Sequence, residues 1–367
     1  MSNAISVSEK IIRALSKFYD ESSRVRISSA HLSGVSYENI GEDGLDFLED
    51  LSKDGKFSTY TTANPMGADI YSNDFGLDDT FIIKQRKIAD ALLRLGAQES
   101  FTCTPYDYFH VPPPYSHVAW AESSAVVYGN AFLGLLTNKE SSLSALASAI
   151  LGETIQSDLH YEKNRIPEVG YKIDELKNEV EAGLAAYYIA KLTKKPFSIT
   201  INTEMTTLMK KSFSAALGAI GETVIFSVNK PTTENHEIRA RDLMVEFKEL
   251  STEDSGDIIV LGCPHFNHNE IEDIVSELGE KHFKKDCLVA CYKGACQKTI
   301  DKYGIYALTK KKIVFFRGAC PIFSPLIKDK GIESVITSSV KAAHYYRLRG
   351  IKVSLKTINE IIKSEAE

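Results

Sequence analysis

The sequence predicts an α/β protein with mainly parallel sheets flanked by helices. In the C-terminal half, short β-branched runs alternate with segments of helical periodicity, which is typical of right-handed βαβ units. The clearest run spans 257–261, stops at Gly262 and precedes an amphipathic segment over 267–278. Cys263 therefore falls at the carboxyl end of a strand, where open parallel sheets place their ligands.

The composition is that of a globular protein with room for one large domain or two to three ordinary ones. Of 367 residues, 43% are hydrophobic and 25% charged, and the net charge of −6 offers no basic footprint for nucleic acid. No apolar run approaches the roughly 20 residues of a membrane span, and the N-terminus has no signal-peptide pattern. Six cysteines without secretory targeting indicate a reducing compartment. We therefore expect a cytoplasmic protein that binds neither nucleic acid nor membranes.

Apolar periodicity and capping signals define the expected elements of the N-terminal half. The expected helices cover 5–19, 79–95, 123–136 and 144–151, and the expected strands cover 25–29 and 57–63. A further β-prone run, 101–103, precedes a loop rich in proline and aromatic residues. A sharp turn at 64–69 is expected to bring backbone close to a ligand.

The same signals continue through the C-terminal half. Helices are expected over 173–192, 205–220 and from 294, and strands over 197–202, 223–228, 287–292, 312–316 and 334–337. We expect a domain organisation in which an N-terminal helix, 1–24, precedes two α/β subdomains with a cleft between them. These subdomains would span 25–166 and 167–367.

Three cysteines share one sequence context. Cys103, Cys263 and Cys320 each follow a β-prone run and precede a proline by one or two residues. Three thiolates converging at strand ends could hold an iron–sulfur cluster and leave one iron open as a Lewis acid. A thiol beside a helix N-terminus, as expected for Cys263, should ionise readily. Buried structural cysteines are the alternative, which the spacing alone leaves open. The remaining cysteines, expected in the core, are Cys287, Cys291 and Cys296.

Six motifs, taken in order, carry a resemblance to a known family. They are AHLSGVSY at 30–37, NPMG at 64–67, CTPY at 103–106, HVAWAESSAVVY at 117–128, TNKE at 137–140 and CPHF at 263–266. Together they resemble the aconitase X family, and in particular its large, catalytic subunit. The resemblance extends over roughly residues 25–350, which is nearly the whole chain.

The resemblance implies a hydro-lyase with an aconitase-like fold and an iron–sulfur cluster held by Cys103, Cys263 and Cys320. A 4Fe-4S cluster is favoured, with 2Fe-2S and 3Fe-4S as alternatives. Known activities of the family include dehydration of (R)-5-phosphomevalonate to trans-anhydromevalonate 5-phosphate in the mevalonate pathway of isoprenoid biosynthesis. The alternative substrates are cis-3-hydroxy-L-proline and other small hydroxy acids. A non-catalytic iron-sensing or RNA-binding relative is the alternative from a different class, which the acidic net charge disfavours.

The resemblance also implies a partner chain. The family's large subunit works with a small, swivelling-domain subunit, which closes over the site and supplies a serine base. This chain shows no segment that would form such a domain, so we expect a heterodimer in which the large chain alone is inactive or nearly inactive.

The matched motifs supply most of the candidate site residues. Those expected to line the same cleft as the three thiols are His31, Asn64, His117, Ser123, Asn138, His265, Ser339 and Lys341. His31, His117 and His265 could polarise the substrate or protonate the leaving hydroxide. Three further cations, Lys139, Arg165 and Lys341, could pair with a carboxylate or phosphate. The remaining expected substrate-binding residues are Ser33, Gly34, Asn64, Pro65, Ser123, Ser124, Thr137, Asn138, Ser338 and Ser339.

Three stretches depart from the family pattern. Gly318-Ala319-Cys320-Pro321 stands where Asp-Thr-Cys-Pro is usual, and Thr337-Ser338-Ser339 replaces Thr-Asn-Ser. The family's Thr-Pro-Glu-Ala stretch is reduced to the residues at 230–234. The cysteine is kept while polar groups beside it are lost, so the departures bear on the substrate rather than on the cluster.

Overall fold

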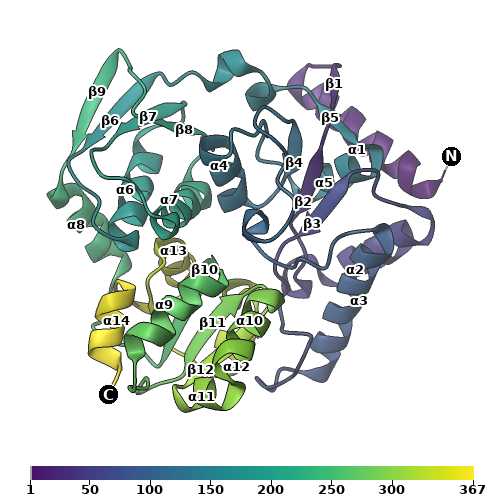
Figure 1. Cartoon of the computed structure of the whole chain (residues 1–367). Helices are drawn as coiled ribbons and strands as arrows, with labels where there is room; N and C mark the ends of the chain where they lie inside the picture. The colour runs from purple at the N-terminus through teal and green to yellow at the C-terminus, as the bar shows by residue number, and fades with distance from the viewer. Residues whose placement is uncertain (1) are drawn as a thin grey trace.

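Three parallel sheets, each flanked by helices, make up the fold in the computed structural model, which describes residues 2–367 (Figure 1). The first sheet has the order β3-β2-β4, and a separate antiparallel pair joins β1 to β5. The strands of these two sheets are β1 (Arg24–Arg26), β2 (Ser29–Leu32), β3 (Tyr60–Ala63), β4 (Val118–Trp120) and β5 (Glu153–Ile155). The accompanying helices are α1 (Asn3–Tyr19), α2 (Tyr37–Asp54), α3 (Asp79–Leu95), α4 (Ser123–Phe132) and α5 (Ser142–Leu151).

The second sheet, in the order β8-β7-β6-β9, comes from the middle of the chain. Its elements are β6 (Val169–Ile173), α6 (Glu179–Leu192), β7 (Phe197–Thr200), α7 (Thr207–Ile220), β8 (Phe226–Val228), β9 (Glu234–Ile238) and α8 (Ala240–Leu250). Helix α7 packs against both α6 and α4, so the middle segment is joined to the first sheet through helices.

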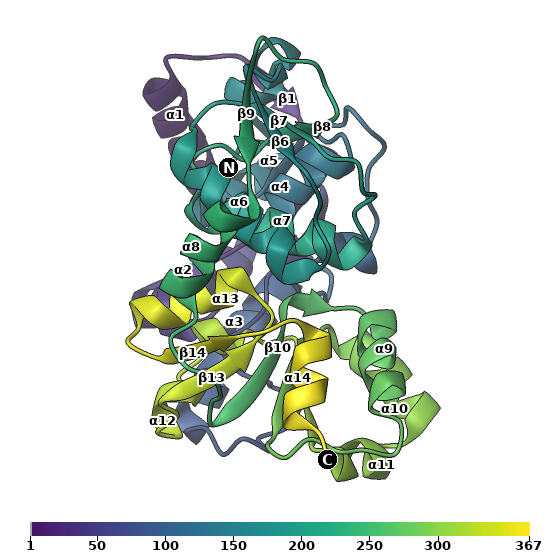
Figure 2. The ribbon, with the colours of Figure 1, turned by 90° about the vertical axis from the view of Figure 1, so that its left-hand side faces the viewer.

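The third sheet has five parallel strands in the order β12-β11-β10-β13-β14. Its strands are β10 (Ile258–Phe266), β11 (Cys287–Cys291), β12 (Ile313–Arg317), β13 (Ser334–Thr337) and β14 (Lys352–Leu355). Its helices are α9 (His268–Leu278), α10 (Lys293–Tyr303), α11 (Ile305–Lys310), α12 (Leu326–Asp329), α13 (Val340–Leu348) and α14 (Ile358–Glu365). Figure 2 shows this sheet below the second one, with α13 between them, where α13 contacts both α6 and α7.

Short 3-10 turns complete the structure. They are η1 (Pro105–Asp107), η2 (Asp158–His160), η3 (Glu162–Arg165) and η4 (Pro321–Phe323). Two of them, η1 and η4, directly follow cysteine loops. No helix within residues 2–367 combines the length and apolar character needed to cross a membrane.

The predicted fold class, mainly parallel sheets flanked by helices, is confirmed. Most of the expected helices and strands lie where the periodicity placed them; for example, α3 begins after Asp78, whose side chain accepts from the Phe81 amide. It ends at Gly96, whose left-handed φ of 107° closes the helix as the sequence predicts. The division of the chain at residue 167 stays a prediction.

Three expected elements are wrong. Residues 101–103 form no strand, because Phe101 has a left-handed φ of 33° that extended backbone excludes. The helix expected from residue 173 starts only at Glu179, where the Asn178 side chain caps it, and the residues up to Ile173 belong to β6. Helix α4 stops four residues early, at Phe132, because Gly134 turns the chain with a φ of 67°.

Candidate functional site

The six cysteines fall into two groups by exposure. Cys103, Cys263 and Cys320 are half-buried, whereas the other three are fully buried in the core. Cys103 lies on the loop between α3 and η1, Cys263 lies within β10, and Cys320 lies between β12 and η4. The interpretation of Cys287, Cys291 and Cys296 as core residues is confirmed.

Cys263 stands out from its sheet because of an irregularity in β10. Pairing with β11 is regular up to Leu261, then shifts register and resumes at Phe266. Gly262 sits at this point with a φ of 86°, and a Cβ there would lie 2.0 Å from the Ala290 carbonyl oxygen. Only glycine fits so close to a neighbouring strand, so the bulge that presents Cys263 depends on it.

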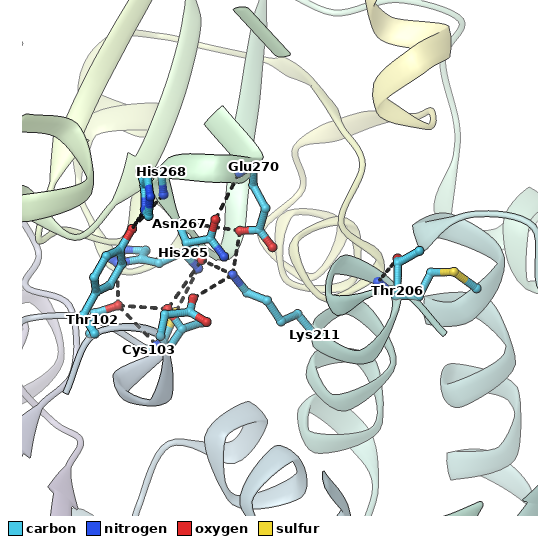
Figure 3. Close-up of polar contacts among 12 residues, drawn as sticks. Thr102, Cys103, Thr206, Lys211, His265, Asn267, His268 and Glu270 are labelled. Atoms are coloured by element: carbon cyan, nitrogen blue, oxygen red, sulfur yellow. Dashed lines mark hydrogen bonds and ion pairs between the residues drawn. The ribbon is translucent and has the colours of Figure 1, made fainter. Parts of the chain in front are cut away.

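His265 ties together the three segments that carry Cys103, Cys263 and Cys320, and Figure 3 shows its contacts with Thr102 and Cys103. Its backbone N–H donates to Cys103 Sγ at 3.2 Å, and its ring Nε2 donates to the Ala319 carbonyl, beside Cys320, at 2.9 Å. The other ring nitrogen lies 3.2 Å from Thr102 Oγ1. Because a carbonyl can only accept, the ring proton belongs on Nε2 and the hydroxyl donates to Nδ1. His265 therefore holds the loops with every polar group occupied.

The turn at 64–69 holds the Cys320 loop from the other side. The Met66 amide donates to the Gly318 carbonyl at 2.9 Å, and the Cys320 amide donates to the Met66 carbonyl at 2.9 Å. Asp69 accepts from the Arg317 guanidinium at 2.7 Å. The turn was predicted to approach a ligand, and the described contacts instead join it to the backbone of a cysteine loop.

The thiols lie close enough to influence one another. Burial raises the pKa of Cys320 to about 12, and the charge of Cys263 is the next cause of this rise. Burial also raises the pKa of Cys103 and the pKa of Cys263. Lys341 opposes the rise at all three. The expectation that Cys263 ionises readily is wrong for the metal-free chain, because loss of hydration outweighs the cation and the Ala342 amide at the start of α13.

Lys341 and Glu122 form a buried ion pair beside the thiols. Lys341 Nζ lies 2.6 Å from Glu122 Oε1 and 3.3 Å from Ser123 Oγ. Asn64 donates to the other Glu122 oxygen at 2.6 Å, and Ser124 donates to Glu122 Oε1 at 3.0 Å. Burial alone would raise the pKa of Glu122, but Lys341 and these donors reverse the effect and hold it at about 2. Glu122 is therefore an ionised acceptor.

His31 extends this network into the first sheet. Its Nε2 lies 2.9 Å from Asn64 Oδ1 and its Nδ1 lies 2.8 Å from Thr62 Oγ1. Burial lowers the pKa of His31 to about 4, so the ring is neutral at pH 7. Since Asn64 Nδ2 donates to Glu122, Asn64 Oδ1 faces His31 and accepts its ring proton.

Lys139 adds a second cation on the same side. Its Nζ donates to the Gly218 carbonyl of α7 at 3.1 Å. Burial lowers the pKa of Lys139, and the charge of Lys341 lowers it further. Two like charges this close favour an anion between them.

Four expected site residues belong to other parts of the structure. His117 directly precedes β4, whereas Glu122 lies beyond the other end of that strand. His117 Nδ1 lies 3.0 Å from His160 Nδ1. Arg165 donates to the carbonyls of Leu159, Asn130 and Leu135, and it lines a separate cavity of about 770 Å³. Thr137 accepts from the Trp120 amide, and Asn138 holds the backbone at 157 and 159.

The remaining expected residues lie on loops of the first and third sheets. Ser33 Oγ lies 3.0 Å from Ser142 Oγ, and a Cβ on Gly34 would lie 2.6 Å from that same oxygen. Pro65 is buried within the turn between Asn64 and Met66. Ser338 is buried, and its neighbour Ser339 caps α13 by accepting from Ala342 at 3.0 Å.

The three thiols and the groups around them fit an iron–sulfur cluster. Within residues 2–367, no three His, Cys, Asp or Glu side chains stand where they could share one metal ion. Sulfurs bound to one ion at about 2.3 Å lie at most about 4.6 Å apart, whereas thiolates of a cluster bind different irons and stand further apart. A cluster of this kind fits the residues present, which are three half-buried thiols, a backbone amide that donates to one of them and a nearby lysine.

Comparison with known proteins places the chain in a family. Residues 1–163 match the model described as the aconitase X first domain, and residues 256–367 match the aconitase X third domain. The large subunit of phosphomevalonate dehydratase from Methanocaldococcus jannaschii is 34% identical, over 91% of this chain and 89% of that protein. The chain belongs to the aconitase X family. The predicted family is thereby confirmed.

Other aconitase X relatives agree in length and fold. The phosphomevalonate dehydratase large subunit from Thermococcus kodakarensis is 31% identical, over 98% of this chain and 95% of that protein. The crystal structure of Thermococcus kodakaraensis aconitase X in its holo-form matches with a TM-score of 0.91 and 28% identity, over 99% of this chain and 96% of that one. The cis-3-hydroxy-L-proline dehydratase from Hypocrea jecorina is 27% identical, and the match spans 88% of this chain but 59% of that protein. The predicted aconitase-like fold is thereby confirmed.

Proposed function

We propose that this chain is the large subunit of an iron–sulfur dehydratase that removes water from a small hydroxy acid. The observation that carries the proposal is the meeting of three half-buried thiols with the Lys341–Glu122 pair. Cys103, Cys263 and Cys320 would hold the cluster, with 4Fe-4S favoured. An open iron would act as a Lewis acid toward the carboxylate and hydroxyl oxygens of the substrate.

The substrate we propose is (R)-5-phosphomevalonate, which would be converted to trans-anhydromevalonate 5-phosphate. Lys139 and Lys341 supply two ammonium groups for an anion, and Ser123 adds a hydroxyl at the first turn of α4. A helix N-terminus favours negative charge through its free N–H groups, so this corner suits a carboxylate or a phosphate. The archaeal relatives named for this substrate also match the chain at higher identity than the hydroxyproline enzymes.

The chain's own residues would orient the substrate and fix the protonation states of the groups around it. Glu122 keeps Lys341 charged and aimed beside Cys263, and Asn64 fixes the second Glu122 oxygen. His31 and His265 are neutral rings whose nitrogens are already hydrogen-bonded, so we assign them positioning roles. The base that takes the α-proton would come from a small-subunit partner, in line with the large-subunit names of the relatives.

Anaerobic reconstitution with iron and sulfide, followed by addition of the small subunit, tests this proposal. Dehydration of (R)-5-phosphomevalonate, followed by product mass and new alkene absorbance, is the expected outcome. The parallel assay uses cis-3-hydroxy-L-proline, and turnover of that substrate alone would overturn the substrate assignment. A Cys263→Ser variant serves as the inactive control, and Cys296→Ser serves as the matched cysteine change outside the site. Failure of the wild type to bind iron would overturn the proposal that the chain holds an iron–sulfur cluster.

A further inference from the structure

A fully buried lysine of the middle segment reaches into the cysteine centre. Lys211 on α7 has no exposed surface, and its Nζ donates to Glu270 at 2.7 Å, to the His265 carbonyl at 2.8 Å and to Asp107 at 3.0 Å (Figure 3). An ammonium has three donors, so all three are used. Lys211 lies in the stretch 164–255, between the two matched family domains.

Its three partners belong to the two loops that carry Cys103 and Cys263. Asp107 ends η1, four residues after Cys103. His265 follows Cys263 by two residues, and its backbone N–H donates to Cys103 Sγ at 3.2 Å. Glu270 is on α9, which follows the Cys263 strand, and it caps that helix by accepting from the Asn267 amide at 2.8 Å. One ammonium group therefore fixes the distance between two cysteine loops that are 160 residues apart along the chain.

Net stability is a weak reason for such a cluster. Three charged groups lose their hydration here, and a buried ion pair is often no more stable than well-packed apolar side chains of similar size. Burial alone would lower the pKa of Lys211, but Glu270 and Asp107 reverse this, so the lysine stays charged. What the cluster supplies beyond burial is direction, because one donor is aimed at the segment after Cys103 and two at the segment after Cys263.

We propose that Lys211 is a positioning residue that sets the spacing of Cys103 and Cys263 before any metal binds. This inference rests on the proposed cluster site. It assigns a role in that site to the middle segment, whose helix α7 would keep the two thiols at the separation that a cluster needs. Replacing Lys211 by methionine keeps the length of the side chain and removes all three hydrogen bonds.

Alkylation of the metal-free, reduced protein measures how firmly the segments that carry Cys103 and Cys263 are held in place. Each cysteine is followed by its rate of reaction with iodoacetamide, using mass spectrometry of the six cysteine peptides. Cys287, fully buried in β11, reacts only when the whole domain unfolds and so reports global stability. In Lys211→Met, the rates of Cys103 and Cys263 relative to Cys287 should rise at least about tenfold, because local opening of the loops becomes easier.

A matched variant separates this effect from loss of a lysine in general. Lys191 on α6 also contacts two carboxylates, Glu246 at 2.6 Å and Glu249 at 2.8 Å, within the same middle segment. Lys191→Met should change the rates of all six cysteines in parallel. The same parallel change in Lys211→Met would overturn the proposal, since it would mean that Lys211 only stabilises the fold.

A second variant decides the matter if Lys211→Met does not fold. Asp107→Asn keeps Lys211 paired with Glu270 and loosens only the loop of Cys103. It should accelerate Cys103 and leave Cys263 unchanged, and an unchanged Cys103 would contradict the proposal. Because the alkylation assay needs no cluster, it remains decisive for Lys211 even if the wild type binds no iron. If iron does bind, the visible circular dichroism of the cluster should differ between Lys211→Met and Lys191→Met.

Discussion

Breaking the ion pair between Lys341 and Glu122 by removing one partner should destabilise this protein more than breaking a surface pair. The two side chains are 9% and 11% exposed, and the charged atoms lie 2.6 Å apart. With an effective dielectric constant of about 20, Coulomb's law gives an attraction on the order of 6 kcal/mol, most of which offsets lost hydration. Removing one partner leaves the other charge buried and unpaired, so Lys341→Met should lower the free energy of unfolding by about 3–5 kcal/mol.

Urea unfolding of the metal-free, reduced protein at pH 7, followed by circular dichroism, measures this change. Glu122→Gln turns one of the two acceptor oxygens, which serve Asn64 on one side and Ser124 on the other, into an NH2 donor, and it removes the charge opposite Lys341, so it should also destabilise. The double variant should recover about 1–3 kcal/mol relative to the sum of the single changes.

The matched control for this pair is Lys195→Met. Its partner Glu168 lies at 2.7 Å, but the side chains are 65% and 54% exposed, so the expected loss is below about 1 kcal/mol. Equal losses at Lys341 and Lys195, or strictly additive effects in the double variant, would refute the reasoning.

Three further outcomes can be measured. After anaerobic reconstitution, Cys263→Ser should lack the cluster absorbance that Cys296→Ser keeps, and the reverse would contradict the ligand assignment. Burial holds the pKa of His265 at about 4 rather than 6.5, so the unfolded chain takes up a proton first and stability is lost as pH falls from 6.5 toward 4. About 3 kcal/mol of this loss should be absent from His265→Gln. If the free energy of unfolding fell with pH equally in the wild type and in His265→Gln, His265 would not be the group responsible. Gly262→Ala, with φ of 86° and a Cβ 2.0 Å from a carbonyl oxygen, should cost about 2–4 kcal/mol. Gly350→Ala, with φ of 77° in open space, should cost about 1–2 kcal/mol, and equal costs would rule out the close approach.

Local sequence signals account for most elements, and two of the missed helices, α2 and α14, differ in how much signal they carried. Helix α2 escaped the periodicity because Gly41, with φ of 61°, interrupts it and leaves only Leu45, Leu48 and Leu51 on its buried face. Helix α14 did carry a signal, since Thr357 and Glu360 form a capping box. The error at 101–103 came from reading β-propensity alone, which does not report the left-handed φ that the buried Phe101 adopts.

Some site residues lay in or near recognised motifs, but their partners are set by the fold and not by the sequence around them. Glu122 lay inside a quoted motif and received no role, because a lone glutamate in a sequence says nothing about a lysine 219 residues away. His117 and Arg165 also lay in or near quoted motifs, yet the fold sends them to a histidine pair and to a cluster of backbone carbonyls. Lys211 gave no signal at all, since a single lysine in an amphipathic helix is ordinary.

By itself, the sequence determined the family, the alternation of strands and helices, and the three cysteines with prolines beside them. These features are local, because strand propensity, capping and motif identity need only neighbours along the chain. Only the tertiary structure decided which cysteine loops meet, that His265 and Lys211 tie them, and that burial rather than a helix N-terminus sets the pKa of Cys263. Hydration loss and long-range hydrogen bonds depend on residues more than 50 positions apart along the chain. No short stretch of the sequence contains both partners.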